Sequence, residues 1–402
     1  MVNLSARIEK HLLNIPEERQ RALKGAIPLA EGAVERDGKR LLNFASNDYL
    51  GLAHHSLLQK RASEWGATYG TGSGASRLIT GNHIAYEKIE SRLAELKGSE
   101  TALILNSGFQ ANSSVLATLL SRVLHGGRDR PEVLLFCDKL NHASLHFGAQ
   151  AANAKQIRFR HNDLAHLDQI LDKYGESEQA KIIVTESVFS MDGDQLDVRA
   201  VRELARRHNA FLYIDEAHAT GVLGAQGMGL CAGVGAGGGS SEELVMGTFG
   251  KGLGSYGAYI ACSHSMRDYL VNSCSGLIYA TALPPQVLGA IDAALEMVPS
   301  LDREREHLKE CGNLFREILQ ENGLDTGLST TQIIPVIIGS DQKTMAVAKS
   351  LEEKGFLVGA IRPPTVPEGS ARLRVTLSAV HTIEQIKGLA QAIIDSCKEV
   401  GL

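Results

Sequence analysis

The sequence predicts an α/β protein with a mostly parallel central sheet flanked by helices, followed by a smaller α+β domain. Up to about residue 290, short runs rich in Val, Ile and Leu alternate with helix-length polar segments, as in sheets covered on both faces. The 402 residues also exceed the ~250–300 at which a single core stops growing. We expect an N-terminal segment over 1–45, a large domain over 46–290 and a small domain over 291–402.

The first hundred residues predict two helices and a strand. Residues 5–25 carry an interrupted apolar pattern with many charges, which is typical of an amphipathic helix. The stretch LLNFASNDYLGL (41–52) predicts a short strand that ends in a loop. Residues 84–97 have helical periodicity and are followed by Gly98, a residue type that commonly ends helices.

Seven short apolar runs predict the strands of the large domain. They are TALILN (101–106), EVLLFCD (132–138), QIRFR (156–160), KIIVTES (181–187), AFLYID (210–215), ELVMGTF (243–249) and AYIACS (258–263). Two further stretches, HGGRDRPE (125–132) and the glycine-rich 231–243, predict surface loops.

The last hundred residues predict the small domain. Residues 290–323 indicate one long helix or two. Three strands and a final helix follow, at IIPVIIG (333–339), FLVGAI (356–361), ARLRVTLS (371–378) and TIEQIKGLAQAIIDSC (382–397).

Composition excludes several classes of function. A net charge of -5 argues against broad nucleic-acid or anionic-membrane binding. No run of ~18 uncharged apolar residues occurs, and the N-terminus lacks the apolar core of a signal peptide, so we expect a cytoplasmic protein. The six cysteines are dispersed without a C-x-x-C pair, so we expect neither disulfides nor a metal site.

Polar residues follow the predicted strands, where parallel sheets bind their ligands. The set comprises Ser107, Gly108 and Phe109 after the first strand, His142, Ser187, Asp215 with His218, and Thr248 with Lys251. Because five strand ends contribute, we expect these groups to meet at one edge of the sheet. Plainer interpretations stay open, since Asp215 could anchor a loop, His142 could be a loop histidine, and residues 106–109 could simply cap a helix.

Lys251 is the hardest of these residues to explain as a solvated side chain. It stands in GTFGKGLGSYG (247–257), and glycine costs roughly 0.5–1 kcal/mol relative to alanine inside an element unless a tight turn or a close ligand requires it. A dinucleotide fingerprint at 252–257 fails, because a strand and not a helix follows it. An ATPase interpretation of DEAH (215–218) fails because the chain has no phosphate loop.

Pyridoxal phosphate (PLP) is the cofactor that fits this combination of groups. It needs a lysine for its Schiff base, a carboxylate that keeps the pyridine nitrogen protonated, a stacking ring and phosphate donors. A lysine in an apolar pocket loses its proton more readily and can then act as nucleophile or base.

Six motifs resemble the α-oxoamine synthase family of fold-type I PLP-dependent transferases. They are SNDYLGL, LNHASL, SVFSMDGD, IDEAHATGVLG, TFGKGLGSYGAYIACS and IRPPTVPEGSARLRVTLSA, and the similarity runs from about residue 40 to 385. The resemblance implies that Lys251 carries the cofactor and that Asp215 pairs with its pyridine nitrogen. It also implies that His218 and Ser187 contact the phenolic oxygen and that His142 stacks on the ring.

The resemblance also implies the remaining contacts. Gly108, Phe109 and Thr248 would hold the phosphate. Thr281 of the partner subunit would reach it too, so the active sites of a homodimer would lie at the subunit interface. Arg362 and Asn47 would bind the amino-acid carboxylate, since a guanidinium matches a carboxylate with two contacts, and Arg77 would contact substrate or phosphate. Phe109 departs from the family, where an aromatic residue with a hydroxyl is common.

The implied reaction is the decarboxylative condensation of L-alanine with a pimeloyl thioester, carried by coenzyme A or by acyl carrier protein, in biotin biosynthesis. Lys251 would remove the α-proton, and His142 is a candidate acid toward a carbonyl oxygen. The PPTVPEG stretch (363–369) beside Arg362 favours this reaction over that of a sister enzyme that joins glycine to acetyl-CoA. Family members that use glycine with succinyl-CoA, or serine with a long acyl-CoA, remain alternatives.

Overall fold

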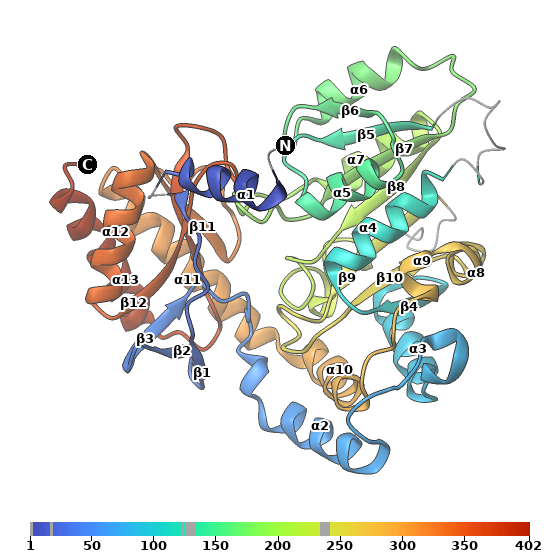
Figure 1. The fold of residues 1–402 in the computed structure, drawn as a ribbon, viewed down its shortest axis with the longest axis horizontal. Helices are drawn as coiled ribbons and strands as arrows, with labels where there is room; N and C mark the ends of the chain where they lie inside the picture. Colours follow the sequence, from blue (N-terminus) through green and yellow to red (C-terminus); the bar gives the residue numbers. More distant parts are fainter. Residues whose placement is uncertain (1–2, 17–18, 122–123, 125–132, 234–241) are drawn as a thin grey trace. The chain divides into compact units, whose positions relative to one another are not determined.

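A computed structural model describes residues 3–16, 19–121, 124, 133–233 and 242–402, and Figure 1 shows its course. The chain forms two compact units. The small unit comprises residues 1–46, 191–193 and 307–402, and the large unit comprises 47–190 and 194–306.

A seven-stranded sheet organises the large unit, in the order β4-β10-β9-β8-β7-β5-β6. Its strands are β4 (Thr101–Leu105), β5 (Leu134–Asp138), β6 (Gln156–Phe159), β7 (Lys181–Glu186), β8 (Ala210–Asp215), β9 (Glu243–Thr248) and β10 (Ala258–Cys262). Only β10 is antiparallel to its neighbours β4 and β9, so the other six strands run the same way. All seven predicted strands are confirmed, and six carboxyl ends meet at one edge.

Helices bury both faces of this sheet. The helices described in the large unit are α2 (Ser56–Tyr69), α3 (Ala85–Lys97), α4 (Gly108–Leu119), α5 (Ala143–Ala151), α6 (Leu164–Asp172), α7 (Val198–Arg207), α8 (His264–Ser273), α9 (Ser275–Ile278) and α10 (Pro285–Met297), of which α2 packs on α10. On one face Leu135 and Val184 pack with Val115 of α4 in a single apolar core. Ile183 and Ile214 point to the opposite face and are equally buried, which explains why the strands read as continuous apolar runs.

Shorter turns connect these elements. A π-helical turn spans Arg77–Gly81, and 3-10 turns span Leu52–His54, Ala225–Gly227 and Val298–Ser300. The predicted helix over 84–97 is confirmed as α3, and Gly98 ends it in the left-handed conformation at φ 70°.

The small unit is built on a six-stranded sheet with the order β1-β2-β3-β12-β13-β11. The strands are β1 (Ile27–Leu29), β2 (Ala33–Arg36), β3 (Lys39–Phe44), β11 (Ile333–Gly339), β12 (Phe356–Ile361) and β13 (Ala371–Thr376). The pair β3 and β12 is parallel and joins the two ends of the chain, whereas the other pairs are antiparallel. The strands predicted near residues 41, 333, 356 and 371 are therefore confirmed.

Two further helices belong to the small unit, and the sequence predicts only the second of them. Helix α12 (Asp341–Glu353) packs against β12 and β13. Helix α13 (Ile383–Glu399) begins with a reciprocal capping box between Thr382 and Gln385 and buries Ile386, Leu389 and Ile393. Within the described residues, no helix is long and apolar enough to cross a bilayer.

The structure corrects one predicted helix and divides another. The helix predicted over 5–25 is α1 (Leu4–Leu13) and ends there, because Pro16 lacks an amide hydrogen and disfavours helical backbone at Ile15. The 290–323 region contains α10 and α11 (Asp302–Glu321), separated by a 3-10 turn that contains Pro299. The loop predicted at 125–132 and residues 234–241 of the glycine-rich stretch lie outside the described residues.

Candidate active site

Lys251 lies in the loop between β9 and β10, and its glycines let this loop pack against two others in the large unit. A Cβ at Gly252 would lie 2.6 Å from the Thr220 carbonyl oxygen. Gly254 has φ +61°, and a Cβ there would lie 2.6 Å from the Ala53 amide nitrogen. We expected these glycines to make room for a ligand, but at these two positions the room is taken by the protein's own backbone. The consequence is that Lys251 Nζ lies 2.7 Å from His218 Nε2.

His218 is linked in turn to the loop that precedes α2. Its Nδ1 lies 2.5 Å from the hydroxyl of Tyr49, which is fully buried. That hydroxyl donates to Asn47 Oδ1 at 3.2 Å. The sequence indicated Asn47 but not Tyr49, although the motif SNDYLGL contains both. Only the contact with His218 reveals the tyrosine.

Asp215 ends β8 with a carboxylate that is 4% exposed. One oxygen accepts the Ala217 amide at 2.8 Å, and the other accepts Asn112 Nδ2 from α4 at 2.7 Å. Tyr213 donates to Asn112 Oδ1 at 2.9 Å and fixes that amide. Each carboxylate oxygen has two lone pairs, so Asp215 can still accept a hydrogen bond from a protonated ring nitrogen.

His142 precedes α5, and its surroundings determine its tautomer. Its Nδ1 accepts the Ser144 amide at 3.2 Å, so the proton of the neutral ring resides on Nε2. Desolvation of the ring lowers the pKa of His142, although the residue as a whole is exposed, and this keeps the ring neutral near pH 7. Asn112 Nδ2 also donates to Ser144 Oγ at 2.9 Å, and Ser144 Oγ lies 2.7 Å from His142 Nδ1. A single side chain, Asn112, therefore connects the surroundings of His142 and Asp215.

Glu186 lies beside these groups and was not indicated by the sequence. It ends β7 and pairs in register with Asp215 on β8. The His142 amide donates to its carboxyl group at 2.5 Å. Burial, followed by the charge of Asp215, raises the pKa of Glu186 well above its ordinary value. The carboxyl group of Glu186 is therefore held toward its protonated, neutral form.

Four further residues that we predict to contact the cofactor lie at or just after the ends of strands in this sheet. Ser187 Oγ is buried and has no hydrogen-bond partner among the described residues, which is the expected state of a group that awaits a ligand oxygen. A Cβ at Gly108 would lie 3.9 Å from Thr248 Cβ, so the start of α4 lies beside Thr248. Thr248 Oγ1 itself donates to the Gly257 carbonyl at 2.8 Å. Phe109 is half exposed and packs on Phe147, so it contributes its backbone amide to this helix start.

Three predicted residues have other surroundings. The guanidinium of Arg77 contacts Glu90 at 2.5 Å and the Ile104 carbonyl at 3.1 Å, and its contact with substrate or phosphate stays a prediction. The Thr281 carbonyl accepts Asn106 Nδ2 at 2.6 Å within the same chain. Arg362 belongs to the small unit, where it lines a cavity of about 550 Å³ together with Arg21 and Lys24.

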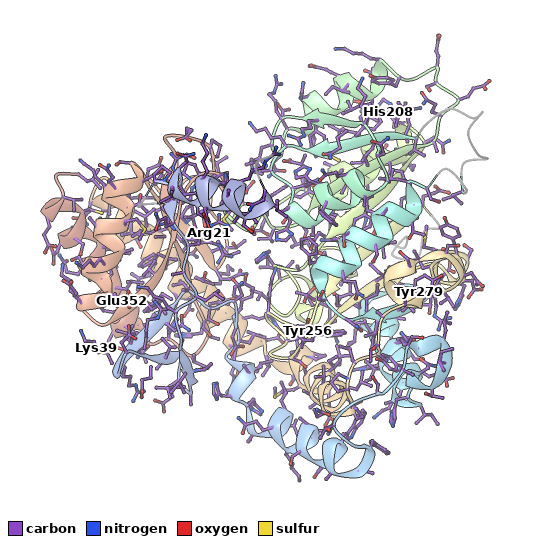
Figure 2. All side chains as sticks on the ribbon, in the orientation of Figure 1. Arg21, Lys39, His208, Tyr256, Tyr279 and Glu352 are labelled. Atoms are coloured by element: carbon purple, nitrogen blue, oxygen red, sulfur yellow. The ribbon has the colours of Figure 1, made fainter. Side chains whose placement is uncertain are left out.

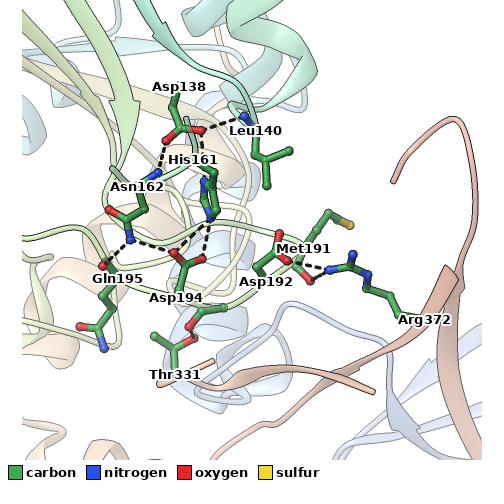
Figure 3. Close-up of polar contacts among 11 residues, drawn as sticks. Asp138, Leu140, His161, Asn162, Met191, Asp192, Asp194, Gln195, Thr331 and Arg372 are labelled. Carbon is green, nitrogen blue, oxygen red and sulfur yellow. Dashed lines mark hydrogen bonds and ion pairs between the residues drawn. The ribbon is translucent and has the colours of Figure 1, made fainter. Parts of the chain in front are cut away.

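A partly buried histidine lies between two carboxylates near these loops (Figure 3). His161 Nδ1 lies 3.1 Å from Asp138, and Nε2 lies 3.2 Å from Asp194. Both ring nitrogens must donate to satisfy these acceptors, which requires the imidazolium form. Burial alone would lower the pKa of His161, but the hydrogen bonds to Asp138 and Asp194 outweigh it and raise the pKa to about 10.

The next residue completes this arrangement. The Asn162 amide donates to Asp138 at 2.7 Å, and its Nδ2 donates to Asp194 at 2.8 Å. Asp138 begins the loop that carries His142 and also accepts the Leu140 amide at 2.8 Å. Asp194 belongs to the turn that begins at Ser187, where Leu196 donates to the Ser187 carbonyl at 3.0 Å. Residues 161–162 therefore connect the two loops that carry His142 and Ser187.

The chain belongs to the aminotransferase class I and II family, which matches residues 39–393. It is 53% identical over 369 residues to the 8-amino-7-oxononanoate synthase of Gluconacetobacter diazotrophicus, covering 92% of this chain and 91% of that one. A crystal structure of 8-amino-7-oxononanoate synthase from Francisella tularensis has a TM-score of 0.75 at 25% identity and covers 90% of this chain and 99% of that one.

A high-resolution structure of SPT with a PLP internal aldimine is similar with a TM-score of 0.87 at 26% identity, over 99% of this chain and 97% of that one. These similarities confirm the predicted α/β class and its fold-type I architecture. They also confirm the resemblance to the α-oxoamine synthases.

The His161 cluster predicts a particular dependence of stability on pH. Because the folded pKa of His161 is raised from 6.5 to about 10, its contribution is fully present below pH 6.5 and is lost as pH rises through about 10. His161→Gln should lower the free energy of unfolding at pH 6 by about 1.5–3 kcal/mol, the usual range for hydrogen bonds to charged groups.

Urea unfolding at pH 6, 8 and 10 measures this effect. The difference between wild type and His161→Gln should shrink toward pH 10, whereas the exposed His264, replaced by Gln, should leave the curve unchanged. An equal difference at all three pH values would contradict a charged His161.

Proposed function

We propose that this protein is an 8-amino-7-oxononanoate synthase, a PLP-dependent acyltransferase of biotin biosynthesis. It would join L-alanine to a pimeloyl thioester of coenzyme A or acyl carrier protein and release CO2 and the free thiol. The observation that carries the proposal is the position of Lys251 and Asp215 after adjacent parallel strands, with His218 at 2.7 Å from the lysine amine. The 53% identity to the Gluconacetobacter diazotrophicus enzyme supports the choice within the family.

The residues present fit PLP. When bound, the cofactor supplies an electron sink for the negative charge left on the amino-acid α-carbon. Asp215 would hold the protonated pyridine nitrogen. The Ser187 hydroxyl, which has no partner in the described part of the chain, would meet the phenolic oxygen with His218. The start of α4 at Gly108, with Thr248 beside it, would bind the phosphate through amides that lack a helical partner.

Lys251 would carry the cofactor and then act as the general base at the α-carbon. Both roles require the neutral amine. His218 Nε2 is placed to accept a proton from that amine.

His142 would position and polarise the second substrate. Its Nδ1 accepts from Ser144, so Nε2–H is the donor that remains for a carbonyl oxygen. Since desolvation keeps the ring neutral, donation from Nε2 involves no prior uptake of a proton. The neutral ring can also stack on an aromatic cofactor.

Arg362 would bind the carboxylate of alanine. Arg21 and Lys24 line the same cavity, which makes it strongly cationic. Asn47 would support the carboxylate through Nδ2, since Tyr49 already donates to its Oδ1.

We further propose a homodimer in the cytoplasm. Several large apolar side chains of the large unit are exposed, including Tyr279 at 84%, Ile79 at 75% and Tyr256 at 56%, the two tyrosines being labelled in Figure 2. Thr281 lies next to Tyr279, which agrees with the role we assign to Thr281 of the partner subunit. The six buried free cysteines suit a reducing compartment. Sedimentation at one chain mass at micromolar concentration would contradict the dimer.

The substrate assignment is tested by a matrix of amino acids and thioesters. Purified protein is offered alanine, glycine or serine with pimeloyl-, acetyl-, succinyl- or palmitoyl-CoA, and with pimeloyl-acyl carrier protein, while thiol release is followed. We expect the highest kcat/KM for alanine with a pimeloyl thioester. Preference for glycine with acetyl-CoA would instead identify a glycine C-acetyltransferase, the alternative from the same family.

The cofactor assignment is tested by absorbance. Wild-type protein incubated with PLP should develop a band near ~420 nm from the bond to the lysine amine, and Lys251→Ala should not. Lys97→Ala is a poor control because Lys97 pairs with the buried Glu216, so the exposed Lys60 serves instead. A band retained by Lys251→Ala and lost in Lys60→Ala would refute the assignment.

The role of His142 is tested by separating condensation from cofactor binding. His142→Ala should slow the reaction with pimeloyl thioester by about 100-fold or more, as typical for loss of a general acid, and by more than any loss of PLP affinity accounts for. His146 is a half-buried histidine on α5, the helix that His142 precedes, and it pairs with Gln156, so His146→Ala is the matched control. An unchanged condensation rate in His142→Ala would remove the acid role.

A further inference from the structure

We propose that Tyr49 is a positioning residue for the catalytic lysine: it holds His218 in the tautomer whose Nε2 takes a proton from Lys251. The inference rests on Lys251 as the lysine that carries the cofactor. It does not depend on which amino acid and thioester the enzyme joins.

Four side chains form one continuous series of contacts in the large unit. Lys251 Nζ lies 2.7 Å from His218 Nε2, and His218 Nδ1 lies 2.5 Å from the Tyr49 hydroxyl. The hydroxyl lies 3.2 Å from Asn47 Oδ1. Both ring nitrogens of His218 therefore make contacts, and the Tyr49 hydroxyl contacts both His218 and Asn47.

The number of available hydrogens determines which atom donates and which accepts in each of these contacts. Tyr49 has one hydroxyl hydrogen, and an amide oxygen such as Asn47 Oδ1 can only accept, so the hydrogen points to Asn47. The Tyr49 oxygen then accepts from His218, which places the histidine proton on Nδ1. The lone pair of Nε2 is left to face Lys251 Nζ.

This arrangement accounts for the neutral amine that the chemistry requires. A proton leaves the Lys251 ammonium and binds His218 Nε2, so a neutral amine and an imidazolium form and no other reactant takes part. The imidazolium donates from Nδ1 to the Tyr49 oxygen, and the Tyr49 hydroxyl continues to donate to Asn47. Tyr49 thus stabilises the charged form of His218, and a hydrogen bond to a charged group is stronger than one to a neutral group.

Burial makes the hydroxyl difficult to replace by solvent. Tyr49 is fully buried and His218 is 5% exposed, so water cannot easily substitute for the lost acceptor. The backbone fixes the tyrosine as well. Asp48 accepts the amides of Leu52 and Ala53 at 2.9 and 3.1 Å, and Ala53 lies against Gly254 in the Lys251 loop.

Other ionisable groups near Lys251 are unchanged when the Tyr49→Phe variant is compared with wild type. His142 and Glu186 interact electrostatically with Lys251, and Asp215 interacts with both of them. Asp48, next to Tyr49, directs its carboxylate to backbone amides. Since Tyr49→Phe removes one oxygen atom and alters none of these groups, a change in the behaviour of Lys251 reports on the hydroxyl.

The test follows bond formation between Lys251 and PLP in the cofactor-free protein, without substrates, between pH 6 and 10. In Tyr49→Phe we expect the rate at pH 7 to fall about tenfold and the midpoint of the pH profile to rise by about one unit, since a one-unit shift is a tenfold change in the neutral amine. Lys251→Ala defines the rate of non-specific reaction. A wild-type protein that fails to exceed this background would refute Lys251 as the cofactor lysine, which is a separate outcome from failure of the Tyr49 proposal.

Tyr86→Phe is the matched control, because Tyr86 is also a buried tyrosine whose hydroxyl oxygen holds a backbone amide, that of Leu283 at 2.9 Å. Its pH profile should superimpose on that of wild type. A Tyr49→Phe profile that also superimposes on wild type would overturn the proposal, and so would an equal shift in both variants.

A second measurement reads the tautomer of His218 in the wild-type protein. In wild-type protein labelled with 15N-histidine, the neutral His218 ring should carry its proton on Nδ1, with the resonance assigned by its loss in His218→Gln. A proton on Nε2 in the neutral ring would overturn the proposal.

Discussion

The common direction of six strands is the constraint on which the candidate site depends. Because β4, β5, β7, β8 and β9 all end at one edge of the sheet, groups from five separate parts of the chain come together without any long-range loop. Antiparallel β10 contributes by returning the chain directly after Lys251, so the lysine loop is short and closed at both ends. The candidate site is therefore formed by several strand ends and not by a single sequence motif.

Close packing between backbone segments then fixes the positions of these groups relative to one another. Gly252 lies against the turn that carries His218, and a Cβ at either Gly221 or Gly252 would meet the other loop. Side-chain amides do the same for the carboxylate: Asn112 joins Asp215 to Ser144 and so to His142. Asp215 and His142 are thus held by Asn112 and Ser144, two side chains to which we assign no chemistry.

Much of this organisation could be predicted from the sequence. The seven strands were evident as apolar runs because both faces of the sheet are buried, and Lys251, Asp215, His218 and His142 were evident because they follow strands. Tyr49, Asn112 and His161 were not evident, because their roles depend on tertiary contacts with residues more than twenty positions away. The ion pair of Arg77 with Glu90 was not evident either, since nothing in the local sequence around Arg77 reveals this partner.

The parallel pair of β3 and β12 has a consequence for synthesis. It joins residues 42–44 to residues 356–358, so the small unit contains strands from both ends of the chain. At 5–20 residues per second, the amino-terminal strands wait roughly 15–60 s on the ribosome for their partner, while nearly all of the large unit has already emerged. The large unit can therefore become organised first, and the small unit assembles only when translation is almost complete.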